Sequence, residues 1–136
     1  MRKVLFVLLV ALLSTTTITA QKTVVSKNQS KENVFDVVEH MPEFLGGMDS
    51  LMVFLQRTVK YPKEAMDKGI QGRVLVKFII EKDGQVSTPE VVKSVYAALD
   101  EEALRVVRCM PNWQPGRQKG KVVRVFFTLP ITFRLQ

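Results

Sequence analysis

The chain has 136 residues, of which 46% are hydrophobic and 24% charged, and its formal net charge is +7. These values are ordinary for a globular protein and fit one domain with a short N-terminal appendage. The basic residues are spread along the chain without a cluster or a known nucleic-acid motif, which argues against nucleic-acid binding. The single cysteine, Cys109, excludes an internal disulfide.

Residues 1–20 have the organisation of a secretory signal peptide. Two basic residues follow Met1, ten apolar residues occupy 4–13, and a small polar tail ends at Ala20. The apolar segment is shorter than the about 20 residues that a helix needs to span a bilayer. We therefore predict export to the periplasm with cleavage after Ala20. The alternative is an uncleaved inner-membrane anchor, because Ile18 is large for a position so close to the cut.

The exported part begins with a polar stretch. Residues 21–40 predict a short linker followed by an extended segment, and we expect the folded domain at 41–136. From Asp49 onward, apolar residues recur at helical spacing, which predicts a first helix. Pro62 and Gly69 then bracket a short further helical stretch, because proline is favoured in a first turn and glycine at a helix end.

Two strands joined by a tight turn follow. Apolar residues alternate along 73–81, which predicts a strand with one buried face. Asp83-Gly84 predicts a two-residue turn of the primed type, in which both residues have positive φ. The second strand is expected at about 85–95 and is interrupted by Pro89.

A second main helix and a third strand complete the domain. Asp100 is the expected N-cap of the helix, which ends before Pro111. The strand at 123–135 alternates apolar residues with arginine, threonine and phenylalanine. Pro89 and Pro130 place the second and third strands at the sheet edges, since a central strand loses a ladder bond at proline. The predicted fold is α+β, a three-stranded antiparallel sheet of order 2-1-3 with two helices packed on one face.

The third strand is predicted to leave one edge of the sheet unpaired. A long edge with alternating apolar residues is a hazard unless a partner or a second copy of the chain covers it. An extended segment of a partner can add to such an edge through main-chain hydrogen bonds. The residues predicted to contact the partner here are Val123, Arg124, Val125, Phe126, Phe127 and Thr128. The alternative is a homodimeric structural or interaction protein of the envelope, paired through the same strand.

The order and spacing of these features resemble the C-terminal domain family of TonB, the periplasmic energy transducer of Gram-negative outer-membrane import. The resemblance covers about 41–136 and rests on Tyr61-Pro62, Ala65, Gly69, Gly72, Val74, Val76, Phe78, Asp83-Gly84, Val86, Val92, Ser94, Leu99-Asp100, Ala103, Trp113 and Pro115. It implies two helices on a three-stranded sheet, and a domain that grips a short peptide at the periplasmic end of a TonB-dependent outer-membrane transporter. It also implies that Tyr61 and Pro62 lie in a segment that contacts the partner.

The chain departs from this family in two places. Thr58-Val59-Lys60 stands where many relatives have Gln-Pro-Gln. A family transducer also has a membrane helix and a long spacer, whereas residues 21–33 reach at most about 45 Å when fully extended. We therefore expect a stand-alone domain that binds a peptide, not one that transmits force.

An enzyme is the rival class. His40 and Cys109 would have to be brought together to form a nucleophile and base pair. Glu101 and Glu102 are adjacent, so on a helix they point in different directions. Metal ligands at useful spacing are absent from the sequence. We expect no catalysis, no cofactor and no metal.

Overall fold

The computed structural model describes residues 33–136, so the predicted signal peptide and all but the end of the predicted linker lie outside the described residues. The elements in chain order are β1 (Val34–Phe35), α2 (Gly47–Thr58), α3 (Lys63–Asp67), β2 (Gly72–Ile80), β3 (Val86–Lys93), α4 (Ala97–Arg108), β4 (Gly116–Gln118) and β5 (Lys121–Phe133). None of the helices in this part of the chain is long and apolar enough to cross a membrane.

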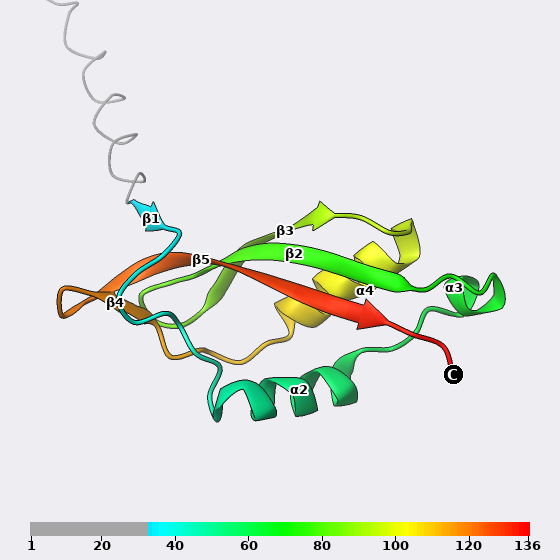
Figure 1. Cartoon of the computed structure of the whole chain (residues 1–136), viewed down its shortest axis with the longest axis horizontal. Helices are drawn as coiled ribbons and strands as arrows, with labels where there is room; N and C mark the ends of the chain where they lie inside the picture. Colours follow the sequence, from blue (N-terminus) through cyan, green and yellow to red (C-terminus); the bar gives the residue numbers. More distant parts are fainter. Residues whose placement is uncertain (1–32) are drawn as a thin grey trace, which may run out of the picture. The chain divides into compact units, whose positions relative to one another are not determined.

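The sheet contains the predicted arrangement within a larger one. Its strand order is β1-β5-β2-β3, and β4 pairs with the first residues of β5 (Figure 1). The α+β class is confirmed, and the predicted order 2-1-3 appears as β3-β2-β5. The prediction of only three strands is wrong, since the described residues form five. The short helical stretch predicted between Pro62 and Gly69 is α3, a third helix beside the two main ones. Strands as short as β1 and β4 show no alternation that a sequence pattern can detect.

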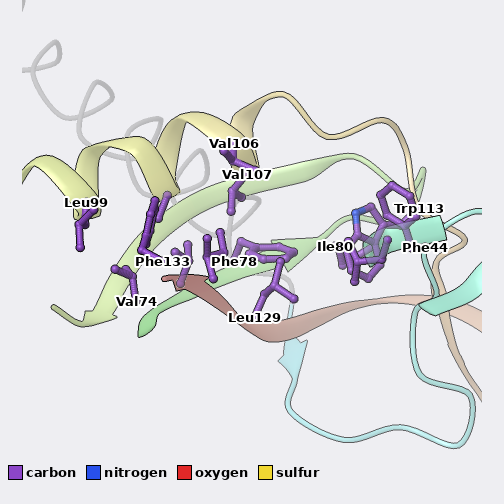
Figure 2. Packing of buried hydrophobic residues seen from close by; sticks show 14 of the residues in the cluster. Phe44, Val74, Phe78, Ile80, Leu99, Val106, Val107, Trp113, Leu129 and Phe133 are labelled. Carbon is purple, nitrogen blue, oxygen red and sulfur yellow. The ribbon is translucent and has the colours of Figure 1, made fainter. Parts of the chain in front are cut away.

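The core lies on one face of β2 and β5. These strands pair antiparallel without irregularity from Gly72 opposite Phe133 to Ile80 opposite Val125. Alternate residues of both strands, among them Val74, Phe78 and Leu129, are buried in one cluster (Figure 2). Helices α2, α3 and α4 contribute Leu51, Ala65 and Leu99 to it. The three helices therefore share the face of the sheet that the alternation predicted as buried. The other cluster members are Phe44, Val76, Ile80, Ala103, Val106, Val107, Trp113, Ile131 and Phe133.

The turn between β2 and β3 has a different geometry from the predicted one. Gly84 has φ +89°, but Asp83 does not have positive φ. The Glu81 N–H donates to the Gln85 carbonyl oxygen at 2.8 Å, so three residues form the loop, with glycine as the last. A Cβ on Gly84 would lie 2.0 Å from the carbonyl oxygen of Trp113. Glycine is thus required both by its φ and by the buried Trp113 that the turn contacts.

Helix α4 begins earlier than predicted. Its N-cap is Tyr96, four positions before Asp100, and Asp100 lies in the first turn. The Asp100 carboxylate accepts a hydrogen bond from the Val95 N–H at 3.2 Å and another from the Ser94 hydroxyl. The prediction of Asp100 as the N-cap was therefore wrong. The carboxylate binds the backbone that precedes the helix, because the helix begins as soon as β3 has ended.

Candidate functional site

Strand β5 has a different neighbour on each side. Val125 pairs with Ile80 of β2 and also with Phe35 of β1, so β1 and β2 lie on opposite sides of β5. Strand β1 runs parallel to β5 and pairs only with Arg124 and Val125. Beyond Val125, no strand of the described residues pairs with the side of β5 that faces away from β2.

The hydrogen bonds around β2 and β5 show which backbone groups face this side. Successive N–H groups of an extended strand point to opposite edges. The Glu81 N–H is directed to Gln85, on the β3 side of β2, so Ile80 and its alternate neighbours in β2 face β5. The Leu135 N–H donates to the Gln71 side chain at 2.7 Å, on the β2 side of β5. Both observations assign the odd-numbered residues of β5 to the ladder with β2.

The even-numbered residues of β5 therefore direct their N–H and C=O groups away from β2. At 128–132 these residues are Thr128, Pro130 and Thr132, and we call their outward backbone groups the open edge. Pro130 fits this assignment, because proline is tolerated in a strand at a position that faces away from the ladder, where no N–H is needed as a donor. We call the stretch Arg124–Val125, which β1 pairs with, the covered edge.

The predicted contact residues fall on both parts of the strand. Val123 pairs with Gly116 of β4, while Arg124 and Val125 pair with β1. The prediction that the strand is an unpaired edge throughout was therefore wrong at Arg124 and Val125, which β1 pairs with on the side opposite β2. Val125 is fully buried, and its N–H belongs to the ladder with β2. A Val125→Pro variant would therefore disrupt the fold and could not serve as a test of peptide docking.

The other three predicted residues of β5 differ in exposure. The Phe127 ring is half-buried and packs on Trp113 and Phe78, with centroid distances of 4.9 and 5.8 Å. Phe126 lies on the opposite face, where the Lys77 Nζ is 4.2 Å from the centre of its ring. Thr128 is exposed and is the one predicted residue on the open edge. Contact of these residues with a partner stays a prediction.

Tyr61 and Pro62 lie between α2 and α3. The Tyr61 ring packs edge-on against Phe133 with a centroid distance of 5.7 Å, and its hydroxyl donates to the Ile70 carbonyl oxygen. Pro62 is the N-cap residue of α3. Both residues have structural roles, and their predicted contact with a partner is not tested by this geometry.

A partly buried ion pair stands beside the covered edge. The Arg124 Nε donates to Glu81 Oε1 at 2.7 Å, and Nη2 donates to Oε2 at 3.2 Å. The Ser87 hydroxyl also donates to the Glu81 carboxylate. The hydrogen bond from Arg124 lowers the pKa of Glu81 below its ordinary value, against the opposing effect of partial burial. The pair joins the start of β5 to the end of β2.

An apolar groove flanks the open edge, and the sequence analysis did not find it. Its volume is about 470 Å³, and α2 forms one wall and the end of β5 the other. The residues that line it are Met48, Leu51, Met52, Leu55, Gln56, Val59, Arg73, Leu129, Pro130, Ile131 and Thr132. Met48 and Met52 are 64% and 51% exposed, which is unusual for residues on the apolar stripe of a helix. The groove could have been found in the sequence, because the apolar stripe of α2 contains more residues than the core buries.

The residues considered for catalysis are used in other ways. His40 pairs through its backbone with Arg117, and Cys109 is exposed at the end of α4. Burial would raise the pKa of Glu102, but hydrogen bonds from Arg105 and the Lys60 N–H lower it below its ordinary value. Residues 33–136 contain no group of three or more histidine, cysteine, aspartate or glutamate side chains that could hold a metal ion.

Comparisons with known proteins agree on one family. The family model described as "Gram-negative bacterial TonB protein C-terminal" matches residues 57–135. Protein TonB of Pseudomonas aeruginosa is 30% identical over 76 residues, which are 56% of this chain and 22% of that protein. Protein TonB of Helicobacter pylori is 35% identical over 78 residues, which are 57% of this chain and 26% of that protein. The chain thus matches about a quarter of the length of these relatives.

A solved structure supports the same likeness. The solution structure of the Helicobacter pylori TonB C-terminal domain superposes with a TM-score of 0.51 at 28% sequence identity. The superposition covers 65% of this chain and 80% of that one. The similarity therefore extends from the sequence to the arrangement of helices and strands.

Proposed function

Because the chain belongs to the family of Gram-negative bacterial TonB protein C-terminal domains, we propose that it binds a short peptide of a TonB-dependent outer-membrane transporter in the periplasm. The peptide adds as an extended strand to the open edge of β5. The observation that carries this proposal is the open edge itself, in which Thr128, Pro130 and Thr132 direct backbone groups away from β2 and no described strand pairs with them.

Strand β1 supports this mode of binding from within the chain. It is an extended segment that pairs with the same side of β5, only a few residues from the open edge. The backbone on that side of β5 is thus shaped to accept an added strand. Peptide addition to a sheet edge takes affinity from such main-chain bonds and specificity from alternate side chains.

The main chain alone gives a modest affinity. The open edge offers two N–H groups, from Thr128 and Thr132, and three C=O groups, because Pro130 has no N–H. Each hydrogen bond contributes a net of about 1 kcal/mol, from which the ordering of the peptide must be subtracted. We therefore expect weak, reversible binding, unless side chains of the peptide add further contacts.

The test is a titration of the full chain with labelled peptides that tile the periplasmic end of TonB-dependent transporters. Thr128→Pro removes an outward N–H and should weaken binding about tenfold, while stability changes by less than about 1 kcal/mol. Thr128→Ala keeps the N–H and is the matched control, with affinity within about twofold of the wild type. Thermal melts check folding. Equal binding by wild type and a folded Thr128→Pro variant would contradict docking at this edge.

A second copy of the chain is the competing occupant of the edge. Sedimentation velocity separates the two cases, because a dimer through the open edge is lost in Thr128→Pro and needs no peptide. If the wild type forms such a dimer and binds no transporter peptide, the homodimeric alternative replaces the proposal.

A further inference from the structure

The segment between β1 and α2 lies outside the part of the chain that matches the family, which begins at residue 57. We call residues 36–45 the strap, because they run alongside β4 and are bound to it (Figure 1). We propose that the strap is a second interaction surface, which binds a basic and partly apolar segment of another polypeptide. The strap shares no residue with the open edge or the groove, and the inference does not depend on peptide docking at β5.

Backbone hydrogen bonds hold the strap in place. His40 and Arg117 exchange two N–H···O=C bonds of 3.1 and 2.8 Å, and Glu43 and Gln114 exchange two of 3.0 and 2.8 Å. Every second to fourth residue of the strap is buried against the domain, and these residues are Val38, Pro42 and Phe44. The strap is therefore a fixed part of the fold, with one side against the core and the other in solvent.

A cavity lies where the pairing of the strap with residues 114–117 is interrupted. Pro42 and Pro115 lie between the two bonded pairs and have no N–H with which to continue the ladder. The cavity has a volume of about 580 Å³, which is within the range of ligand sites in proteins. Met41 and the two prolines give it an apolar lining, and Glu39 and Glu43 add acidic groups.

The solvent side of the strap is rich in apolar residues. Of the eight large hydrophobic residues that are exposed among residues 33–136, six lie between Val37 and Val53. Two of the six line the groove, whereas Val37, Met41 and Leu45 belong to the strap and are 77%, 42% and 57% exposed. Single exposed apolar residues are ordinary, but a concentration of them on one fixed segment beside a cavity favours an interaction site.

The charge of the strap determines which partner is complementary to it. Residues 33–56 contain no lysine or arginine and four acidic residues, so their net charge is −4. Residues 57–136 contain 15 basic and 8 acidic residues, a net charge of +7. The strap is thus an acidic, apolar surface on a basic domain. An anionic membrane is disfavoured as its occupant, because the carboxylates would be repelled by the lipid head groups.

The strap carboxylates are available to a partner. None of the ion pairs among residues 33–136 includes Asp36, Glu39 or Glu43. Glu39 Oε1 accepts a hydrogen bond from the Lys119 N–H at 2.7 Å, which fixes this carboxylate beside the cavity. Arg117 also lines the cavity, so its two carboxylates leave a net negative charge there. A lysine or arginine of the partner can lay its stem on Met41 and direct its charged group to a carboxylate.

The test titrates the full chain with three model peptides, which consist of lysine and leucine, glutamate and leucine, or lysine and serine. We expect only the lysine–leucine peptide to bind, and to bind more weakly at high salt. The positive net charge of the chain opposes unspecific binding of this peptide. Met41→Gln should weaken its binding about tenfold and Glu43→Gln about threefold. The matched controls, Met66→Gln on α3 and Glu90→Gln on β3, change the same exposed side chains elsewhere and should leave the affinity unchanged.

A variant of the open edge separates this inference from the proposed function. Thr128→Pro removes an outward N–H of β5 and leaves the strap intact, so it should bind the lysine–leucine peptide as the wild type does. Loss of binding in Thr128→Pro, or equal binding by the wild type and Met41→Gln, would overturn the strap as the docking surface. A dimer in sedimentation velocity that Met41→Gln abolishes would assign the strap to a second copy of the chain and also overturn the proposal. Should Met41→Gln fail to fold in thermal melts, Leu45→Gln gives the same comparison.

Discussion

The covered edge and the open edge belong to the same strand and to the same side of it, yet only one of them has a neighbour. At Arg124 and Val125 the outward side of β5 is paired with β1 and supported by the Arg124–Glu81 ion pair. At Thr128 to Thr132 it has no strand neighbour among the described residues and lies beside an apolar groove. The difference teaches that the exposure of β5 is local: along this side of the strand, the stretch without a strand neighbour is the stretch beside the groove.

The coincidence has a physical reason. An uncovered edge invites aggregation, and proteins usually cover or blunt it. Here β1 covers one part, and Pro130 removes one donor from the other without closing it. An edge that is left open next to exposed methionines is stable in solution only if its affinity for other strands is low. Low intrinsic affinity combined with a neighbouring apolar groove is what a reversible peptide-binding domain needs.

Amide hydrogen exchange tests the comparison most directly and should give the largest effect. The N–H groups of Leu129 and Ile131 belong to the β2 ladder and should exchange only on global opening. Those of Thr128 and Thr132 should exchange at least about a thousandfold faster, since no strand in residues 33–136 pairs with them. Two-dimensional NMR after transfer to D₂O measures both sets in one sample. Equal protection along 128–132 would mean that the edge is covered in solution.

A bound peptide provides the control for this experiment. If the open edge is the docking site, saturating peptide should slow exchange at Thr128 and Thr132 and leave Leu129 and Ile131 unchanged. Protection that appears elsewhere in the domain would assign the peptide to another surface.

Much of this geometry could be predicted from the sequence. The alternation along 123–135 identified the buried face of β5, as Val125, Leu129, Ile131 and Phe133 are all buried. The two strand prolines indicated the order in which β3, β2 and β5 lie. Both signals are local, because side-chain period and proline chemistry act through the residues of one strand.

The features that could not be predicted from the sequence depend on contacts between segments that lie far apart in the chain. The pairing of Val34 and Phe35 with β5 spans about ninety positions of the chain and involves too few residues to form a pattern. The groove requires α2 and β5 to be placed side by side, which the helical spacing of α2 does not specify. The misplaced cap at Asp100 is a local error, in which a strong N-terminal signal was assigned to the wrong backbone group. The predicted contact residues lie on β5, and three of them are residues that β1 or β4 pairs with; their contact with a partner stays a prediction.

Phe35→Pro should shift the boundary between the two edges. Proline at this position disrupts the short pairing of β1, which we expect to destabilise the domain by about 1 kcal/mol. The outward groups of β5 that β1 pairs with then join the open edge. Peptide affinity should rise about fivefold through one added main-chain bond. Fluorescence titration checks this, and a fall in affinity would show that β1 is part of the docking site instead of a cover.

Glu81→Gln should produce the smallest effect and should act on the covered edge alone. The ion pair is partly buried, with side-chain exposures of 20% for Arg124 and 26% for Glu81, so we expect a loss of about 1 kcal/mol in the free energy of unfolding. Arg124→Gln should cost a similar amount, and the double variant little more than either, since all three remove the same interaction. Urea unfolding at neutral pH measures these differences.

The pH dependence of this loss follows from the direction of the pKa shift. The pKa of Glu81 is lowered from its ordinary value of 4.5 in the folded state. The unfolded chain therefore binds a proton before the folded one does, and the stabilisation is present above about pH 4.5 and is lost as the pH falls through the folded pKa. The wild type and Glu81→Gln should thus converge in stability on acidification. Because the pair stands beside the covered edge, peptide affinity at the open edge should stay unchanged in the variant; a parallel loss of affinity would mean that the two edges are coupled.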